Sequence, residues 1–239
     1  MKKAIIPLLI VIFLIGLNCN STRSNQIKDA HKWYRKGIDL SQQQNYEQAL
    51  EAYNMSLKLN PNDEETWVCK SYVLNALGRY HEAITACNWA LAASREPITI
   101  FNMPMTNPSV EKLAWNNRGY ALMKLGNYLS AYADFSRALE TDPHYLDALN
   151  SKGECLKKLN QPDQALIVLG KAIEIDPKNA NAYYRRAAVY SGLNNKKNTL
   201  EDLGKAIELD SINRTRAKKN TDFQWLWGDE EFKKIVGSP

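Results

Sequence analysis

The sequence predicts an all-α protein built from stacked helix pairs, and three features of the chain lead to this fold class. Bulky side chains recur with a 34-residue period, from Trp33 to Trp67 and from Trp115 to Leu149 and Tyr183, with one 14-residue insertion between Trp67 and Trp115. Apolar residues recur at helical spacing in two runs within each repeat. Proline follows the second run in three repeats. One helix pair cannot bury its apolar face alone, so the pairs are expected to stack into a solenoid.

The composition excludes several classes of protein. Of 239 residues, 44% are hydrophobic and 24% are charged, which excludes a wholly disordered chain and one with many membrane spans. The net charge of +5 is too small to indicate a nucleic-acid partner. With three His and 11 Gly, the chain offers little material for metal clusters or glycine-rich phosphate loops.

The first element along the chain is a predicted signal peptide over residues 1–18. Lys2 and Lys3 precede an uncharged apolar run over residues 4–17. As a helix this run would span about 21 Å, short of the roughly 30 Å hydrocarbon core of a bilayer. A charged start, a short apolar middle and a polar end are typical of a secretory leader. The alternative is an uncleaved membrane anchor.

Cys19 ends this segment in a context that resembles a bacterial lipobox. Gly16 stands three places before the cysteine and Asn18 just before it, where Leu and Gly or Ala are usual. The resemblance implies lipidation of Cys19, followed by a polar tether over residues 19–29. It predicts an exported protein, anchored as a lipoprotein in a membrane of the cell envelope. The alternative is ordinary cleavage near Cys19, which would release a soluble periplasmic or secreted protein.

Small side chains keep fixed positions through the rest of the chain. Three columns recur with the repeat: Gly37, Ser71, Gly119, Gly153 and Ala187; Ala49, Ala83, Ala131, Ala165 and Thr199; and Ser56, Ala90, Ala138, Ala172 and Ala206. Small residues at a fixed phase let two helix axes approach within roughly 8–10 Å. Pro61, Pro143 and Pro177 close three repeats, because proline cannot continue a helix.

These columns resemble the tetratricopeptide repeat (TPR). Five units are expected: 30–63, 64–96, 112–145, 146–179 and 180–213. Pro162 and Lys196 depart from the pattern, since they replace the aromatic residue found at Tyr46, Tyr80 and Tyr128. The resemblance implies a right-handed superhelical solenoid of helix-turn-helix units with no cofactor.

Two further segments are expected around the five units. The insertion at about 97–111 holds three prolines, which forbid a regular helix, yet it is too apolar for a passive linker. It is expected either to fold over neighbouring helices or to present a contact surface. Residues 214–239 are expected to form capping helices, with Asp229 starting the last one. Trp225, Trp227 and Phe232 are expected to pack this cap against the repeats.

The TPR resemblance also implies where a partner would bind, because the first helix of each unit lines the concave face. The side chains implied at this groove are Tyr34, Ile38, Val68, Tyr72, Asn75, Asn116, Tyr120, Asn150, Glu154 and Tyr184. Tyrosines give broad contact and amides can hydrogen-bond to an extended backbone, which suits a peptide or a partner helix. The alternative is that these side chains only solvate the face. The Lys and Asn clamp that binds chaperone tails in some members is absent.

The sequence gives no indication of an enzyme or of a metal site. It contains none of the phosphate-loop, zinc-protease or serine-hydrolase motifs, and carboxylates such as Asp134 have no periodic partner. A Cys69–Cys87 disulfide is conceivable in an exported protein, but buried free thiols are favoured for Cys69, Cys87 and Cys155. The predicted function is a lipid-anchored scaffold for protein–protein interaction at the bacterial cell envelope. The alternative is a periplasmic chaperone or assembly factor that holds client proteins transiently.

Overall fold

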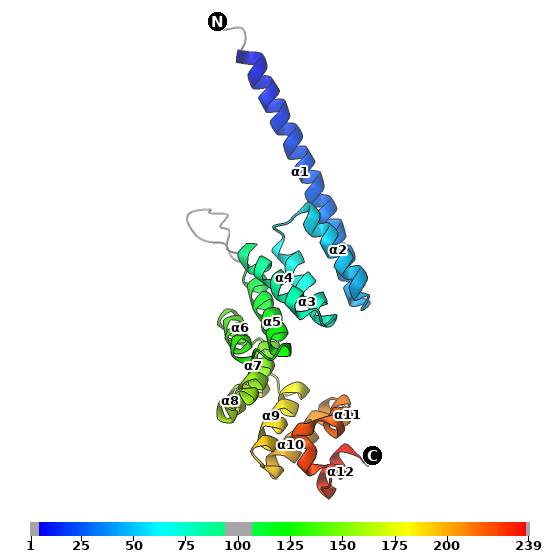
Figure 1. The fold of residues 1–239 in the computed structure, drawn as a ribbon, viewed down its shortest axis with the longest axis vertical. Helices are drawn as coiled ribbons and strands as arrows, with labels where there is room; N and C mark the ends of the chain where they lie inside the picture. Colours follow the sequence, from blue (N-terminus) through cyan, green and yellow to red (C-terminus); the bar gives the residue numbers. More distant parts are fainter. Residues whose placement is uncertain (1–4, 94–106, 238–239) are drawn as a thin grey trace. The chain divides into compact units, whose positions relative to one another are not determined.

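The computed structural model describes residues 5–93 and 107–237, with side chains from residue 23 onward (Figure 1). Every regular element in these ranges is a helix. The chain divides into two compact units, Met1–Val110 and Glu111–Pro239, which are described separately. The described residues form five helix pairs and a C-terminal helical cap, so the predicted all-α fold of helix-turn-helix repeats is confirmed.

The first unit contains two helix pairs. Its helices are α1 (Ile5–Gln42), α2 (Tyr46–Leu59), α3 (Glu64–Ala76) and α4 (Tyr80–Ala93), and each packs against the next. Side chains 23–29 of α1 are exposed, and Ala30 is the first buried one. There the Ser56 hydroxyl donates a hydrogen bond to the Ala30 carbonyl oxygen at 2.9 Å. Packing of the repeats therefore begins at Ala30, although α1 itself starts earlier and runs through the predicted tether.

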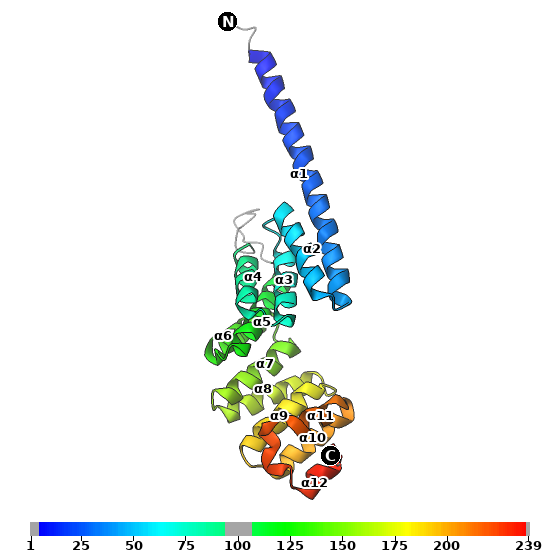
Figure 2. The same cartoon turned by 45° about the vertical axis from the view of Figure 1, so that its right-hand side comes forward.

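The second unit contains three helix pairs and the cap. The pairs are α5 (Pro108–Lys124) with α6 (Tyr128–Thr141), α7 (Leu146–Lys158) with α8 (Pro162–Ile175), and α9 (Ala180–Gly192) with α10 (Lys196–Leu209). Figure 2 shows α7 to α10 following one another toward the C-terminus. The cap consists of α11 (Ile212–Lys219), the 3₁₀ helix η1 (Thr221–Leu226) and α12 (Glu230–Val236).

The turn inside each helix pair uses one residue with left-handed backbone geometry. These residues are Gln44, Gly78, Gly126, Asn160 and Asn194, with φ between 56° and 82°. Gly and Asn adopt this conformation at the least cost, and it lets the chain reverse after the first helix. The turn keeps the same register as the side-chain columns, so each pair reverses at the same point of the repeat.

The column of small residues on the first helices is explained by close packing against the second helices. A Cβ atom added at Gly37 would lie 2.5 Å from Tyr53, one at Gly119 would lie 2.9 Å from Phe135, and one at Gly153 would lie 2.6 Å from Leu169. These distances are shorter than a normal van der Waals contact. The large side chain on each second helix thus fills the space that a glycine leaves on the first.

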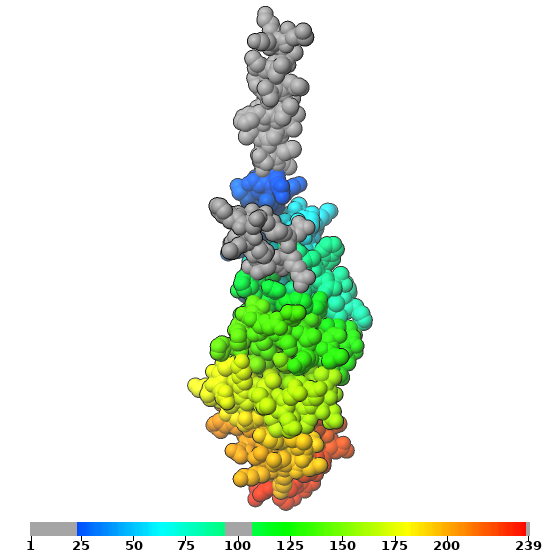
Figure 3. Space-filling model, turned by 90° about the vertical axis from the view of Figure 1, so that its left-hand side faces the viewer, coloured from blue at the N-terminus to red at the C-terminus, as the bar shows by residue number. Residues whose placement is uncertain are grey.

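The cap covers the apolar end of the last repeat. Phe223, Leu226, Phe232 and Val236 are buried in one cluster with residues of α9 and α10. Figure 3 shows the red C-terminal segment against the orange surface of that repeat. The Asp229 carboxylate accepts hydrogen bonds from the backbone N–H groups of Glu231 and Phe232, so the predicted helix start at Asp229 is confirmed.

The two tryptophans of the cap, which the sequence predicts to pack against the repeats, are exposed. Trp225 is 46% exposed and Trp227 is 39% exposed. Trp225 still contacts the last repeat, because its indole N–H donates a hydrogen bond to the Ser191 hydroxyl of α9 at 2.7 Å. The buried anchors of the cap are its phenylalanines and aliphatic residues, because these lie on the face of η1 that meets α9 and on the face of α12 that meets α10.

The predicted insertion falls partly outside the described residues, which resume at Asn107. Its end is helical, because α5 begins at Pro108 and not at residue 112. The Asn107 side chain accepts a hydrogen bond from the Ser109 N–H at 3.2 Å. Proline suits the first position of a helix, where its missing N–H is not needed. Pro108 thus starts a helix instead of preventing one.

The predicted signal peptide and Cys19 lie outside the residues whose side chains are described. Within the described part of the chain, no helix combines the length and the apolar character needed to span a membrane. The other three cysteines form no disulfide, and Cys87 and Cys155 are buried. The expectation of burial is therefore confirmed for Cys87 and Cys155, whereas Cys69 is half-buried.

Candidate protein-binding groove

A cavity of about 410 Å³ in the second unit is lined by the first helices of three successive repeats and by the start of the cap. We call it the α5–α7–α9 cavity. Tyr120, Glu154 and Ala188 line it from α5, α7 and α9 at the 34-residue spacing of the repeat. Met123 and Lys157 line it one turn further along α5 and α7. Stacked repeats bring the same helix face to the same side, so one sequence column becomes a continuous wall.

The cap closes one side of this cavity. Arg216 of α11 places its guanidinium 4.3 Å from the centre of the Tyr184 ring. The Asn220 amide donates a hydrogen bond to the Tyr184 hydroxyl at 3.0 Å. Phe223 packs edge-on against the same ring, with 5.6 Å between centroids. Tyr184 is therefore held on three sides by residues that follow the last repeat.

Glu154 connects the charged groups of the cavity wall. Its carboxylate lies 3.2 Å from Lys157 Nζ and 3.2 Å from Arg185 Nη1. The same Lys157 ammonium also pairs with the Asp222 carboxylate of η1. Asp222 is fixed in turn, because its backbone carbonyl accepts a 2.6 Å hydrogen bond from the Ser191 hydroxyl. The wall is thus a network of ion pairs between α7, α9 and the cap.

Three of the five site residues predicted in this unit, Tyr120, Glu154 and Tyr184, line the cavity. Tyr184 offers it little surface, because only 5% of the residue is exposed and burial raises the pKa of its hydroxyl. Asn116 and Asn150 are not among the residues that line the cavity. Their side-chain oxygens are buried and accept no hydrogen bond from any described residue.

The five site residues predicted in the first unit have different surroundings. Ile38 is half-buried, and Val68 and Asn75 are buried, so the latter two present little surface to a partner. Tyr34 lies 6.4 Å from Tyr53 between ring centroids, and burial raises the pKa of its hydroxyl. Tyr72 is 54% exposed and is the most accessible of the five.

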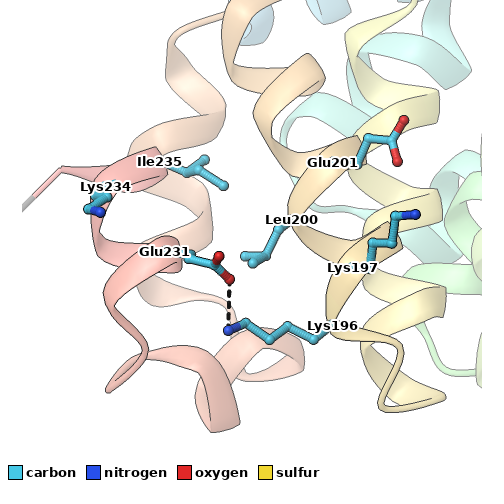
Figure 4. A pocket seen from close by; sticks show the side chains of 7 residues that line it. All are labelled: Lys196, Lys197, Leu200, Glu201, Glu231, Lys234 and Ile235. Carbon is cyan, nitrogen blue, oxygen red and sulfur yellow. Dashed lines mark ion pairs between the residues drawn. The ribbon is translucent and has the colours of Figure 1, made fainter.

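A second cavity, of about 780 Å³, lies between α10 and the cap helix α12 (Figure 4). Leu200 and Ile235 form its apolar part, and charged side chains surround them. Lys196 Nζ pairs with Asp229 at 2.7 Å and with Glu231 at 2.8 Å. These pairs join the cap to the last repeat, so we interpret this region as a structural joint.

Sequence reasoning missed the part of the α5–α7–α9 cavity that the cap supplies. Arg216, Asn220 and Asp222 belong to no repeat, and hence no column predicts where they lie. Lys124 was also missed, although it stands one repeat length before Lys158 and both line the cavity. Among the described residues, no group of three His, Cys, Asp or Glu side chains is placed to hold a metal ion.

Stacked helix pairs with a cavity along their first helices define a helical-repeat protein. Models of the tetratricopeptide repeat match residues 30–63, 122–189 and 180–213, which together cover more than half of the chain. The chain belongs to the tetratricopeptide repeat family.

Several known proteins are similar to this chain. A 57-residue segment is 40% identical to an uncharacterised protein of Methanocaldococcus jannaschii, covering 24% of this chain and 66% of that protein. The structure resembles that of YrrB, described as a TPR protein with an unusual peptide-binding site, with a TM-score of 0.58 and 26% identity over 84% of this chain and 97% of YrrB. It also resembles PilW, described as a widely conserved type IV pilus biogenesis factor, with a TM-score of 0.68 and 16% identity over 86% of this chain and 90% of PilW. This second likeness shows the fold alone.

Proposed function

We propose that this protein is a binding scaffold that holds a peptide segment of another protein in the α5–α7–α9 cavity. The observation that carries the proposal is the cavity itself, where Tyr120, Glu154 and Ala188 bring one column of three repeats to one wall. Its volume of about 410 Å³ is within the range of known ligand sites, roughly 300–1,000 Å³. The mechanism is recognition by a preformed surface.

The comparison with YrrB supports the same function. YrrB is described as having a peptide-binding site, and its likeness to this chain covers most of both proteins. We therefore propose a binding role and not a catalytic one.

We further propose that the protein is exported and anchored to a membrane of the cell envelope through a lipid on Cys19. This rests on the sequence alone: a charged start, a 14-residue apolar run and a cysteine at its end. Several buried acyl chains would hold the protein firmly, since each CH₂ contributes about 0.8 kcal/mol. Cys19→Ala is expected to move the protein from the membrane fraction to the soluble fraction. An unchanged membrane fraction would contradict lipidation.

The binding role is tested by crosslinking in cells followed by capture of the protein with its partners. Tyr120→Ala/Met123→Ala removes two side chains from the cavity wall, and Leu129→Ala is the control because Leu129 is 71% exposed on α6. The cavity variant is expected to lose one or two stoichiometric partners that the wild type and the control retain. Equal capture by all three proteins would contradict the proposal. Weak capture of many unfolded chains would indicate a chaperone instead.

A further inference from the structure

The α5–α7–α9 cavity carries an excess of positive charge. Five basic side chains line it, Lys124, Lys157, Lys158, Arg185 and Arg216, against two acidic ones, Glu154 and Asp222. The excess is three positive charges in one site. Such an excess favours ligands of opposite charge.

The basic groups are spread over the cavity and do not meet at one point. They come from α5, α7, α9 and α11, which are four separate elements. Lys124 and Lys158 are exposed, so a ligand can contact them without any rearrangement of the helices. A single carboxylate would reach only one or two of these groups. The distribution fits an extended chain that carries several acidic side chains.

Two of these basic side chains, Arg185 and Lys157, already pair with carboxylates of the protein itself. Arg185 pairs with Glu154 through Nη1, while its buried Nε donates to no described residue. Lys157 is shared between Glu154 and Asp222. Asp222 belongs to the cap and not to a repeat, and its carboxylate pairs with Lys157 on the cavity wall, which is the contact that an acidic side chain of a ligand would make.

We infer that the α5–α7–α9 cavity binds an extended acidic segment of a partner protein. When the segment is absent, the Asp222 carboxylate pairs with Lys157 in its place. The inference rests on the proposed function and specifies its ligand. Acidic side chains of the partner contact Lys124, Lys158 and Arg216, and one of them competes with Asp222. The apolar part of the segment packs against Tyr120 and Met123.

The test measures peptide binding to the purified full chain by fluorescence anisotropy at low ionic strength. The probe is a labelled peptide in which four Glu alternate with Gly and Ser, with both ends blocked so that only side chains carry charge. A matched peptide has Gln in place of Glu, and a third has Gln with a free C-terminal carboxylate. The Glu peptide is expected to bind about tenfold more tightly than either Gln peptide, and to weaken with added salt. Equal binding of the three peptides would overturn the inference.

Two variants that change the net charge equally test whether the Glu peptide binds in the cavity. Lys124→Glu/Lys158→Glu reverses two cations of the wall and is expected to weaken binding of the Glu peptide about tenfold. Lys171→Glu/Lys178→Glu reverses two exposed lysines elsewhere in the same unit and is expected to leave binding within about twofold. Equal losses in both would assign binding to general charge and overturn the site.

Asp222→Asn tests the competing carboxylate. Removing its charge takes away one of the two carboxylates that pair with Lys157 and is expected to tighten binding of the Glu peptide about threefold. Unchanged or weaker binding would show that Asp222 does not occupy the ligand position. Thermal unfolding of this variant checks that the cap is still docked.

Three further results separate the possible outcomes: a lipid surface as the ligand, a scaffold with a different ligand, and no binding role for the cavity. If phosphatidylglycerol vesicles bind through Lys124 and Lys158 while the Glu peptide does not, the cavity recognises a lipid surface and the inference fails. If capture of the cellular partner requires Tyr120 but the Glu peptide does not bind, the scaffold role stands and the acidic ligand is wrong. If capture does not require Tyr120, the proposed function itself fails.

Discussion

The guanidinium of Arg118 and the carboxylate of Asp134 form a two-bond ion pair, with both N–O distances at 2.8 Å. The same pair recurs two repeats later, where Arg186 meets Asp202 at 2.7 Å in both bonds. Each arginine also lies over an aromatic ring three positions before it, at 4.5 Å from Trp115 and 5.6 Å from Tyr183. The first and second helices of two repeats are therefore joined by one shared arrangement.

Loss of the acidic partner is expected to destabilise the second unit. Asp202 is buried, and Asp202→Ala would leave the half-buried Arg186 guanidinium without its two strongest hydrogen bonds. The expected cost is about 2–3 kcal/mol in the free energy of unfolding, measured by urea denaturation. Glu140→Ala breaks a pair with Arg137 in which both side chains are about two-thirds exposed, and it should cost less than about 0.5 kcal/mol. Equal costs would contradict this account.

This ion pair also shows where sequence reasoning reaches its limit. The expectation that Asp134 has no periodic partner is wrong, because the pairing returns two repeats later, at Arg186 and Asp202, and not in the next repeat. In the intervening repeat the equivalent residues are Lys152 and Val168, so a search at the single-repeat period finds no match. The basic residue alone keeps the shorter period, and Lys152 instead lies 4.8 Å from the centre of the Tyr132 ring.

Gly119 is predicted to be intolerant of a side chain for a specific steric reason. The added Cβ of Gly119→Ala would lie 2.9 Å from Phe135 Cε1, and Phe135 is fully buried, so the ring has little room to move. We expect a loss of about 1–2 kcal/mol, since overpacking costs more than the helix propensity gained by replacing glycine.

Gly170→Ala is the matched control for Gly119→Ala. Gly170 lies inside α8, and an added Cβ there would meet nothing within 4 Å. This variant should gain about 0.5–1 kcal/mol from helix propensity. Denaturation midpoints that shift in the same direction for both variants would contradict the steric explanation.

The helices and part of the candidate site in the second unit follow from the repeat. The columns predict which face of α5, α7 and α9 lines the cavity, so Tyr120 and Glu154 could be named in advance. They do not predict burial at Asn150, because that depends on how closely Asn179, the residue that caps the start of α9, approaches. Nor do they predict Asp222, since the cap occurs once and has no column. Aperiodic contacts need three-dimensional information.

Cys155 is predicted to make the second unit sensitive to alkali. Burial raises the pKa of its thiol to about 12, with a smaller contribution from Glu154, so the folded protein keeps the proton at high pH. In the unfolded chain the thiol loses its proton near its ordinary pKa of about 8.5. Because the folded pKa is the higher one, stability is fully present below about pH 8.5 and is lost as the pH rises toward 12.

The measurement for Cys155 is the urea midpoint at pH 8 and at pH 10. Cys155→Ala removes this titration, so its midpoint should fall less between the two pH values than that of the wild type. The comparison uses the change with pH, which cancels any constant effect of the substitution on packing. Identical decreases would show that other groups, such as the half-buried Tyr145, account for the alkaline loss.

Phe223 is predicted to hold the cap on the last repeat. It is fully buried, contacts Tyr184 edge-on, and lies 6.3 Å from the Phe232 ring of α12. Phe223→Ala should therefore cost about 3–5 kcal/mol, through lost burial and the cavity left behind. Because Asp222 lies beside Phe223, the same change should break the ion pair between Asp222 and Lys157. Trypsin should then cleave the cap at Lys218 and Lys219 faster than in the wild type.

Trp227→Ala, at a position that is 39% exposed, is the control and should cost much less. Equal trypsin rates for the wild type and Phe223→Ala would mean that the contacts of α12 and α11 hold the cap without this ring.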